Sequence, residues 1–384
     1  MNRDELAGWL RLTLTPGVGN GAARRLLTAF GLPPAIFEQP AHALERCVTM
    51  AQAQALRAIP EGWAVLVETT WAWLCGAGPD GPARAILTLG DPAYPQALLD
   101  TEDPPLLLYA LGPAAVLAAD PFAQGRCLAI VGSRNPTAQG ADNARQFARA
   151  LQAAGLTIVS GLALGVDAAA HEGALDNAAD GAPRPATIAV VGTGLDRVYP
   201  RKNLDLARRI AAHGLLVSEY PLSTPPLAAN FPKRNRIIAG ISQGTLVVEA
   251  ALASGSLITA RLAVEQGREV FAIPGSIHAP QSRGCHALIQ QGAKLVESAQ
   301  DVLEELRLPA AGAVAQPSHQ GMELGDVPES ALLQVLGFDP VGLDTLMART
   351  GMDTAALQVA LLELELAGAV ARLPGGLFQR MGRA

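Results

Sequence analysis

The fold is decided by the apolar run Arg126-Cys127-Leu128-Ala129-Ile130-Val131, which leads directly into Gly132-Ser133-Arg134-Asn135. An apolar run without alternation is typical of a strand buried on both faces of a parallel sheet. Further short apolar runs follow at 156–160, 187–192, 215–218, 245–249, 269–273 and 293–296, with helical patterns between them. Strands that alternate with helices predict an α/β fold with a doubly wound, Rossmann-like parallel sheet.

Small residues, hydroxyls and cations follow most of these strands. In such sheets ligands bind beyond the carboxyl ends of the strands. Glycine lets the backbone approach a ligand, and hydroxyls and amides donate to anionic oxygens. The residues expected to converge there are Ser133 and Arg134, the loop 161–167, Gly192 to Gly194 with Tyr199 and Lys202, and Ser254, Gly255 and Ser256. The sequence therefore predicts an anion-binding edge.

A basic stretch, 230–240, precedes the run at 245–249. It places Phe231 beside Lys233, Arg234, Asn235 and Arg236, in a chain that has only three lysines. Because proline fixes φ, Pro232 predicts a loop-to-helix junction that presents the cations to a phosphate backbone. Phe231 is expected either to stack on a base or to belong to the core, and the sequence leaves both open.

The charge distribution favours a polyanion in the middle of the chain. The net charge is −6, which by itself argues against nucleic acid. Residues 126–300, however, carry 17 basic and 12 acidic side chains, whereas the segments before and after them are both acidic. A basic middle between acidic flanks is where a polyanion docks.

Three domains are expected from the length of 384 residues and the changes in pattern. Residues 1–80 are predicted to form a helical domain, SAM-like or helix-hairpin-helix-like, because Gly17 and Gly19 flank Val18 at a turn between helices. A turn-rich linker at 76–82 leads to the Rossmann-like domain, 85–307. A Pro- and Ala-rich linker, 308–328, precedes a winged-helix-like domain, 329–384, with helical runs at 331–336, 342–349 and 354–366 and a hairpin about Gly375-Gly376.

The third helical run of the last domain is acidic. In winged helices this helix usually enters the major groove. Here residues 353–368 contain Asp353, Glu363 and Glu365 and no Lys or Arg, so phosphate should repel them. We interpret this domain as a protein-contact module.

The sequence lacks the motifs of most other functions, including membrane insertion, metal binding and hydrolysis. No run of eighteen apolar residues is present, which predicts no membrane insertion, and the N-terminus lacks a signal-peptide pattern. The four cysteines have no paired spacing, so we expect reduced thiols of a cytoplasmic protein and no metal site. There is no P-loop, and the G-x-S-x-G pattern at 240–244 lies between a helix and a strand, the reverse of the hydrolase order.

Together these motifs resemble the DNA-processing protein A (DprA/Smf) family. The resemblance rests on Val131 to Arg134, Ser160 to Asp167, Gly192 to Gly194 with Tyr199-Pro200, Ser218 to Pro221, Phe231 to Ile237, Val248 to Ala250 and Ser254 to Ala260. It covers residues 85–300 strongly.

The resemblance implies a non-enzymatic, cytoplasmic bacterial protein without a cofactor. Such a protein binds and protects single-stranded DNA, works as a homodimer, and loads the recombinase RecA onto DNA taken up in natural transformation. The family's DNA site carries over to Ser133, Arg134, Arg234, Asn235, Arg236, Ser254, Gly255 and Ser256, with Lys202, Phe231 and Lys233 as further candidates. Gln139 stands where the family often has tyrosine.

Two other functions compete with this interpretation. The sheet-edge loops also resemble, more weakly, Rossmann-like phosphoribohydrolases that cleave nucleotides. Those enzymes place P-G-G-x-G-T before a catalytic glutamate, whereas here Gly244-Thr245 precede Glu249 without Pro-Gly-Gly. A transcriptional regulator that reads DNA through the last domain is the third hypothesis, which the acidic helix disfavours.

Overall fold

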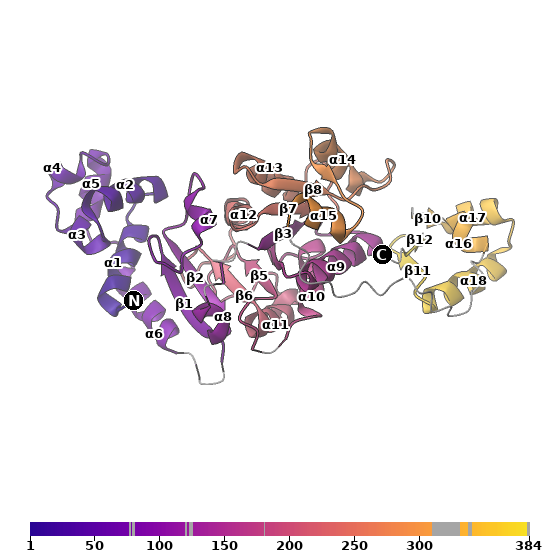
Figure 1. Ribbon diagram of the computed structural model, residues 1–384, viewed down its shortest axis with the longest axis horizontal. Helices are drawn as coiled ribbons and strands as arrows, with labels where there is room; N and C mark the ends of the chain where they lie inside the picture. The colour runs from indigo at the N-terminus through magenta and orange to yellow at the C-terminus, as the bar shows by residue number, and fades with distance from the viewer. Residues whose placement is uncertain are drawn as a thin grey trace.

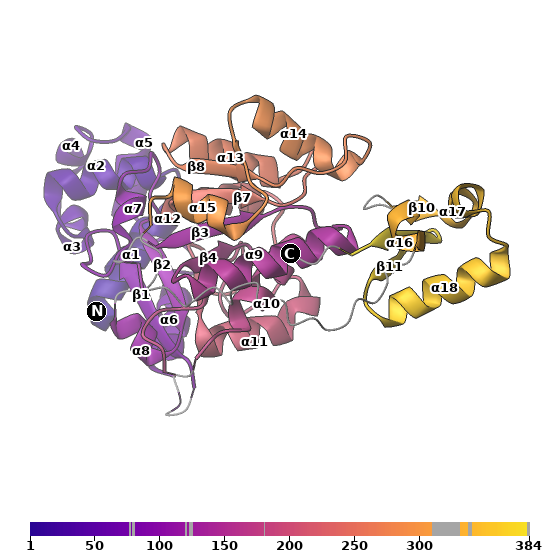
Figure 2. The same cartoon turned by 45° about the vertical axis from the view of Figure 1, so that its right-hand side comes forward.

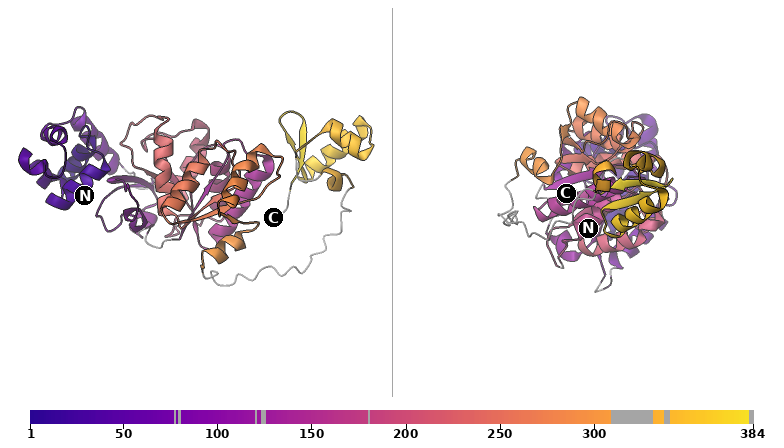
Figure 3. Two further views of the ribbon diagram at one scale, coloured as in Figure 1. Left: turned by 90° about the horizontal axis from the view of Figure 1, so that it is seen from above. Right: turned by 90° about the vertical axis from the view of Figure 1, so that its right-hand side faces the viewer.

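The computed structural model describes residues 1–76, 78, 81–119, 121–122, 126–179, 181–308, 331–336 and 340–381. A helical N-terminal region, a central α/β region and a small C-terminal region follow one another along the long axis (Figure 1). The N-terminal and C-terminal regions lie at opposite ends of the central one (Figure 3).

The N-terminal region consists of short helices around one core. Asn2 caps the first helix, because its side chain accepts from the backbone N–H of Glu5 while the Glu5 carboxylate accepts from that of Asn2. Trp9 and Leu26 are among its buried side chains. The predicted turn at Gly17 is present between the first two helices, and its φ of +76° is one that glycine adopts readily. The helices are α1 (Arg3–Leu14), α2 (Asn20–Phe30), α3 (Pro33–Phe37), α4 (Ala41–Leu44), α5 (Met50–Arg57) and α6 (Trp63–Cys75).

The central region is built on a mostly parallel sheet. Over the described residues it has nine strands in the order β1-β2-β6-β5-β4-β3-β7-β8-β9, and every neighbouring pair from β6 to β9 is parallel. The strands are β1 (Ala83–Thr88), β2 (Leu107–Gly112), β3 (Cys127–Val131), β4 (Thr157–Ser160), β5 (Thr187–Val190), β6 (Leu215–Ser218), β7 (Gly244–Val247), β8 (Glu269–Ala272) and β9 (Lys294–Leu295).

Helices cover both faces of this sheet (Figure 2). Alternate residues of β3 point to opposite faces: Cys127, Ala129 and Val131 pack with one set of helices, and Leu128 and Ile130 with the other. The first set is α12 (Asn230–Ile241), α13 (Ser256–Glu265) and α14 (Arg283–Gln290); the second is α9 (Ala138–Ala153), α10 (Val166–Leu175) and α15 (Ala299–Glu305). α11 (Leu204–His213) packs on β5 and β6 beside α10. The remaining short helices are α7 (Gln96–Leu99), α8 (Ala114–Ala118), and the 3-10 turns η1 (Arg201–Asn203) and η2 (Pro280–Ser282).

The predicted fold class is confirmed. Each of the seven predicted strands is present, and the bounds differ by at most two residues at either end. The sequence analysis missed β1 and β2, an antiparallel pair that extends the sheet beyond β6.

The expected loop-to-helix junction in the basic stretch was wrong in position. Helix α12 begins at Asn230, before Pro232. Proline is tolerated in the first turn of a helix because the N–H that it lacks has no intrahelical partner there. Lys233, Arg234 and Arg236 therefore stand on the first two turns of a helix.

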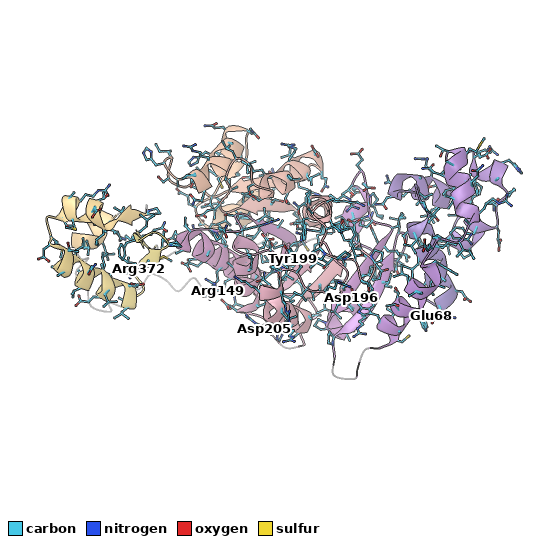
Figure 4. All side chains as sticks on the ribbon, turned by 180° about the vertical axis from the view of Figure 1, so that it is seen from behind. Glu68, Arg149, Asp196, Tyr199, Asp205 and Arg372 are labelled. Carbon is cyan, nitrogen blue, oxygen red and sulfur yellow. The ribbon has the colours of Figure 1, made fainter. Side chains whose placement is uncertain are left out.

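The C-terminal region has the winged-helix arrangement that the sequence predicts. Its elements are α16 (Ala331–Leu336), β10 (Val341–Gly342), α17 (Leu343–Thr350), α18 (Thr354–Leu366), β11 (Val370–Leu373) and β12 (Leu377–Arg380), with a sheet in the order β10-β12-β11. It has its own core, which includes Leu346, Leu361 and Phe378. The guanidinium of Arg372, which is labelled in Figure 4, lies 5.8 Å from the centre of the Phe378 ring. The predicted linker 308–328 lies outside the described residues except for Leu308.

No helix within the described ranges is long and apolar enough to cross a membrane. Over the same ranges, no three His, Cys, Asp or Glu side chains are grouped as metal ligands would be.

Candidate nucleic-acid interface

The loops that follow β3, β4 and β7 meet at one edge of the sheet. β3 lies between β4 and β7, at the point where the strand order reverses, and ligands of α/β sheets bind at this position. The backbone N–H of Ser133 donates to the carbonyl of Glu249 at 2.7 Å, and the carbonyl of Ser133 accepts from Val166 N at 3.1 Å. A Cβ on Gly132 would lie 2.9 Å from the Glu249 carbonyl oxygen, so only glycine fits there. The predicted convergence of these loops is observed.

Three of the predicted site cations are exposed at or near this edge. Arg134 follows β3, Lys202 lies in η1 after β5, and Lys233 stands in the first turn of α12. Among the described residues none of the three side chains forms an ion pair with a carboxylate. Asn203 fixes the turn that carries Lys202, because its Nδ2 donates to the carbonyl of Leu162 at 3.0 Å. These cations are free to meet an external anion.

Arg234, by contrast, is built into the protein. Its side chain is only 5% exposed, and Nη1 donates to the carbonyl of Gly161 at 2.8 Å and to that of Val190. Burial lowers the pKa of Arg234 to about 10; the Asp167 carboxylate acts in the opposite direction, and the nearby charge of Arg134 lowers it further. Arg234 therefore holds the ends of β4 and β5 together.

Arg236 is also occupied by protein groups. Its Nη2 donates to Glu219 at 2.6 Å and its Nε to Asp103 at 3.1 Å, and its side chain is 12% exposed. Burial lowers the pKa of Arg236, but the Glu219 and Asp103 carboxylates outweigh it, so the pKa lies above its ordinary value. Of the three cations predicted in this stretch, only Lys233 is presented to solvent.

Two aromatic rings lie side by side near these cations. The rings of Phe231 and Tyr199 have their centroids 5.5 Å apart and are tilted by 41°. Tyr199 is 50% exposed, and Phe231 is half-buried against the backbone of Gly192, where a Cβ would lie 3.1 Å from its ring (Figure 4 labels Tyr199). The sequence predicts Tyr199 at this edge, in the connection that follows β5, but does not pair it with Phe231.

The loop Ser254–Ser256 supplies hydroxyls at the start of α13. The Oγ atoms of Ser254 and Ser256 are 2.7 Å apart, and Asn235 Nδ2 donates to the carbonyl of Gly255 at 3.5 Å, a weak hydrogen bond. Gly255 is the N-cap of α13, and the first backbone N–H groups of this helix are engaged within the loop: Ser256 N donates to Ser254 Oγ at 3.3 Å, and Leu257 N donates to the carbonyl of Ser254 at 3.2 Å. Helix α12, which carries Lys233, packs against α13.

A buried polar group supports the edge from beneath. The Asp167 carboxylate accepts from the backbone N–H groups of Gly161 at 3.1 Å and Ala163 at 3.3 Å. Burial raises the pKa of Asp167, and Arg234 opposes that shift. His171 lies within 2.7 Å of Thr187 Oγ1 through Nδ1, and burial lowers the pKa of His171 to about 3. These groups are scaffold rather than ligand contacts, since Asp167 is 8% and His171 0% exposed.

The two carboxylates that could serve as catalytic acids are engaged. Glu249 accepts from the backbone N–H of Thr137 at 3.0 Å and from its hydroxyl at 2.5 Å, at the start of α9. A Cβ on Gly140 would lie 2.3 Å from the Glu249 carboxyl carbon, so the glycine is required for this fit. Glu219 is paired with Arg236. Both carboxylates hold the edge in shape.

The family model described as DNA recombination-mediator protein A matches residues 85–307, which include this whole edge. The chain belongs to this family. A second family model, the DprA winged helix domain, matches residues 314–376.

Curated relatives and solved structures agree with this assignment. The chain is 41% identical to Protein Smf of Escherichia coli over 345 residues, which cover 88% of this chain and 86% of that one. It is 48% identical to DNA processing protein DprA of Streptococcus pneumoniae over 224 residues, 58% of this chain and 74% of that one.

Two solved structures of the family resemble the chain. The structure of DprA from S. pneumoniae matches with a TM-score of 0.62 at 36% identity, covering 79% of this chain and 98% of that one. A structure of DprA from Helicobacter pylori, titled for its single-stranded DNA binding mode, matches with a TM-score of 0.50 at 31% identity, covering 58% and 95%. Membership in the family supports a role in DNA processing.

Proposed function

We propose that this DprA-family protein binds single-stranded DNA along the carboxyl edge of its parallel sheet. The observation that carries the proposal is the joint presence of exposed, unpaired cations and an aromatic pair at that edge. Arg134, Lys202 and Lys233 supply charge for phosphates, and Tyr199 with Phe231 supplies faces on which bases stack. Single-strand binders combine these two elements. The H. pylori relative, whose title names single-stranded DNA binding, supports the same ligand.

In this proposal the contacts divide into two kinds. The backbone of the strand is met by Arg134, Lys202, Lys233 and the Ser254–Ser256 loop. Arg234 and Arg236 shape the edge from within the protein, because their guanidinium groups are already hydrogen-bonded to protein oxygens. Backbone contacts do not read sequence, so we expect weak dependence on base sequence.

A salt-dependent titration tests the proposal. Single-stranded and double-stranded oligonucleotides of equal length are titrated at several salt concentrations against the wild type and Arg134→Ala, Lys202→Ala and Lys233→Ala. Arg208→Ala is the matched control, since Arg208 is exposed on α11 and paired with Asp205. We expect preference for the single strand and a loss confined to the three edge variants. Equal binding of duplex, or equal losses in the control, would contradict the proposal.

The proposal extends to the partners that the family resemblance implies. We propose that the protein protects incoming single strands in the bacterial cytoplasm, works as a homodimer, and loads RecA onto the strand during natural transformation. The four cysteines are free thiols, in keeping with a reducing compartment. Sedimentation of the purified chain tests the dimer, and RecA filament formation on strands coated with single-strand-binding protein tests loading.

We also propose that the protein acts without catalysis. The competing phosphoribohydrolase hypothesis requires a free carboxylate at the edge, whereas Glu249 is bonded to Thr137 and Glu219 to Arg236. Incubation with nucleoside monophosphates and chromatography for free base tests this directly. Release of base that is lost in Glu249→Gln would favour the enzyme.

A further inference from the structure

Helix α18 of the C-terminal region is apolar on two opposite sides. One side carries Leu357 and Leu361, which are buried in the core with Leu346 and Val370. The other side faces away from that core. An exposed apolar patch rimmed by polar residues often marks a site of interaction with another molecule.

The outer side of α18 carries one continuous apolar stripe. Ala355, Val359, Leu362 and Leu366 follow one another at spacings of four, three and four residues. At 3.6 residues per turn this spacing places them on a single line, as in the seam of a coiled coil. Val359 is 58% exposed, Leu362 54% and Leu366 81%. Val359, Leu362 and Leu366 are not part of the core of this region, so packing within it does not explain why they are apolar.

The stripe is bordered by negative charge. At 100° per residue, Glu363 and Glu365 lie on opposite sides of the line through Leu362 and Leu366. Neither carboxylate is ion-paired within the residues that the structure describes, and residues 353–368 contain no Lys or Arg. Free carboxylates repel a phosphate backbone, so this helix is not suited to DNA. A second copy docked through the same stripe would bring like charges together, which is destabilising.

We propose that the outer stripe of α18 is a docking surface for a basic amphipathic helix of a partner protein. An apolar seam on the partner covers Val359, Leu362 and Leu366, and Lys or Arg beside that seam pairs with Glu363 and Glu365. This is helix-to-helix recognition, in which the apolar anchors give affinity and the flanking charges select the partner. The position that reads DNA in other winged helices is thus used here to bind protein.

A designed peptide probes the surface in the full-length chain. The probe is a labelled helical Leu/Lys peptide of about 18 residues with leucines at i, i+3, i+4 and i+7 spacing. Two control peptides have the same composition in scrambled order, and the same pattern with Glu in place of Lys. Fluorescence anisotropy measures each affinity. We expect the patterned Leu/Lys peptide to bind, and both controls to bind at least about tenfold more weakly.

Two variants assign the binding to α18. Leu362→Asp with Leu366→Asp should weaken the Leu/Lys peptide about thirtyfold or more, since two anchors are lost. Glu363→Lys with Glu365→Lys should weaken that peptide and strengthen the Leu/Glu peptide. The melting temperature should fall far less in either variant than in a variant of the core, because the four side chains are exposed. Leu361→Ala, on the buried side, should lower the melting temperature and serves as the folding control.

Three outcomes would overturn the proposal. The first is equal binding of the patterned and scrambled Leu/Lys peptides, which would mean non-specific attraction. The second is self-association of the full chain that Leu362→Asp abolishes, which would assign the stripe to a second copy. The third is a loss of DNA affinity in the Leu362→Asp, Leu366→Asp variant, which would assign the stripe to nucleic acid.

Discussion

The Arg234 guanidinium on α12 donates a 2.8 Å hydrogen bond to the carbonyl of Gly161, the first residue after β4. A Cβ on Gly161 would lie 2.5 Å from that guanidinium, so glycine is required there. The same side chain reaches the Val190 carbonyl at the end of β5 and acts on the buried Asp167. One arginine from one face of the sheet thus ties two strand ends and the loop between β4 and α10.

Arg234 and Arg134 should respond oppositely to substitution by alanine. Arg234→Ala removes the donor to two carbonyls and the positive charge beside the buried Asp167, so the free energy of unfolding should fall by about 3–5 kcal/mol. Arg134→Ala should leave stability unchanged and reduce the logarithmic salt slope for single-stranded DNA by about 0.7, the loss of one phosphate contact. Urea denaturation and salt titration measure the two quantities.

The salt slope of Arg234→Ala shows whether Arg234 contacts DNA or only stabilises the fold. Both arginines were expected from sequence to contact phosphates. If Arg234→Ala also lowers the salt slope while remaining folded, its guanidinium reaches DNA after all. If neither variant changes the slope, the edge is not the DNA site.

The aromatic pair should hold bases by stacking. Tyr199→Ala and Phe231→Ala should each weaken single-strand binding by about 1–3 kcal/mol. Tyr199→Ala should leave the melting temperature unchanged, because the ring is half exposed. Tyr199→Phe keeps the stacking face and is the matched control. Because the rings touch, the loss in the double variant should differ from the sum of the single losses.

The stability of the Phe231→Ala variant shows whether Phe231 is a core residue or a base-stacking residue. As a core residue it would lose about 3–5 kcal/mol of unfolding free energy on truncation to alanine. Phe231 is half-buried on Gly192, so we expect a smaller loss of stability together with a loss of affinity. A sharp fall in melting temperature with normal DNA binding by the folded fraction would assign Phe231 to the scaffold.

The parallel strands could be predicted from sequence because each of them is a short, nearly continuous run of apolar residues. Residues 127–131 are apolar without alternation, as strands covered on both faces require. The antiparallel strands β1 and β2 were missed because they pair with each other across a Pro-containing connection. The only helix described between them, α7, has four residues and is too short to mark a βαβ unit.

Which of the cations are exposed to solvent, and so able to contact DNA, could not be predicted in the same way. Lys233, Arg234 and Arg236 are alike in the sequence, yet only Lys233 is exposed. The difference arises from contacts made across the fold: Arg234 meets Gly161 and Val190, and Arg236 meets Glu219 and Asp103. Helix periodicity alone does not predict which side chain forms a hydrogen bond with a carbonyl or a carboxylate of another loop.

His171 should make stability depend on pH. Its folded pKa is lowered to about 3 by burial, whereas an unfolded histidine has a pKa of about 6.5. The folded state therefore does not take up the proton, and the contribution of His171 to stability is full above pH 6.5 and is lost as the pH falls. Between pH 6.5 and 5 the loss should approach about 2 kcal/mol.

Chemical denaturation at several pH values measures this effect. His171→Asn keeps a donor near Thr187 and removes the titrating group, so its stability should fall less between pH 6.5 and 5. His278→Gln is the control, because His278 is exposed. Parallel pH dependence in the wild type and His171→Asn would contradict the assignment.

Removal of residues 325–384 should leave most single-strand affinity in place. The exposed cations and the aromatic pair all lie between Arg134 and Lys233, and the C-terminal region has a separate core. Its helix α18 has no cation to offer a phosphate. Anisotropy titrations of the truncated and full-length proteins at one salt concentration, with circular dichroism to establish folding, measure the difference. A loss of about a hundredfold, or about 2.8 kcal/mol, in a folded truncation would show that this region does bind DNA. A sequence-selection assay on the full chain would then establish whether it reads bases, as a transcriptional regulator does.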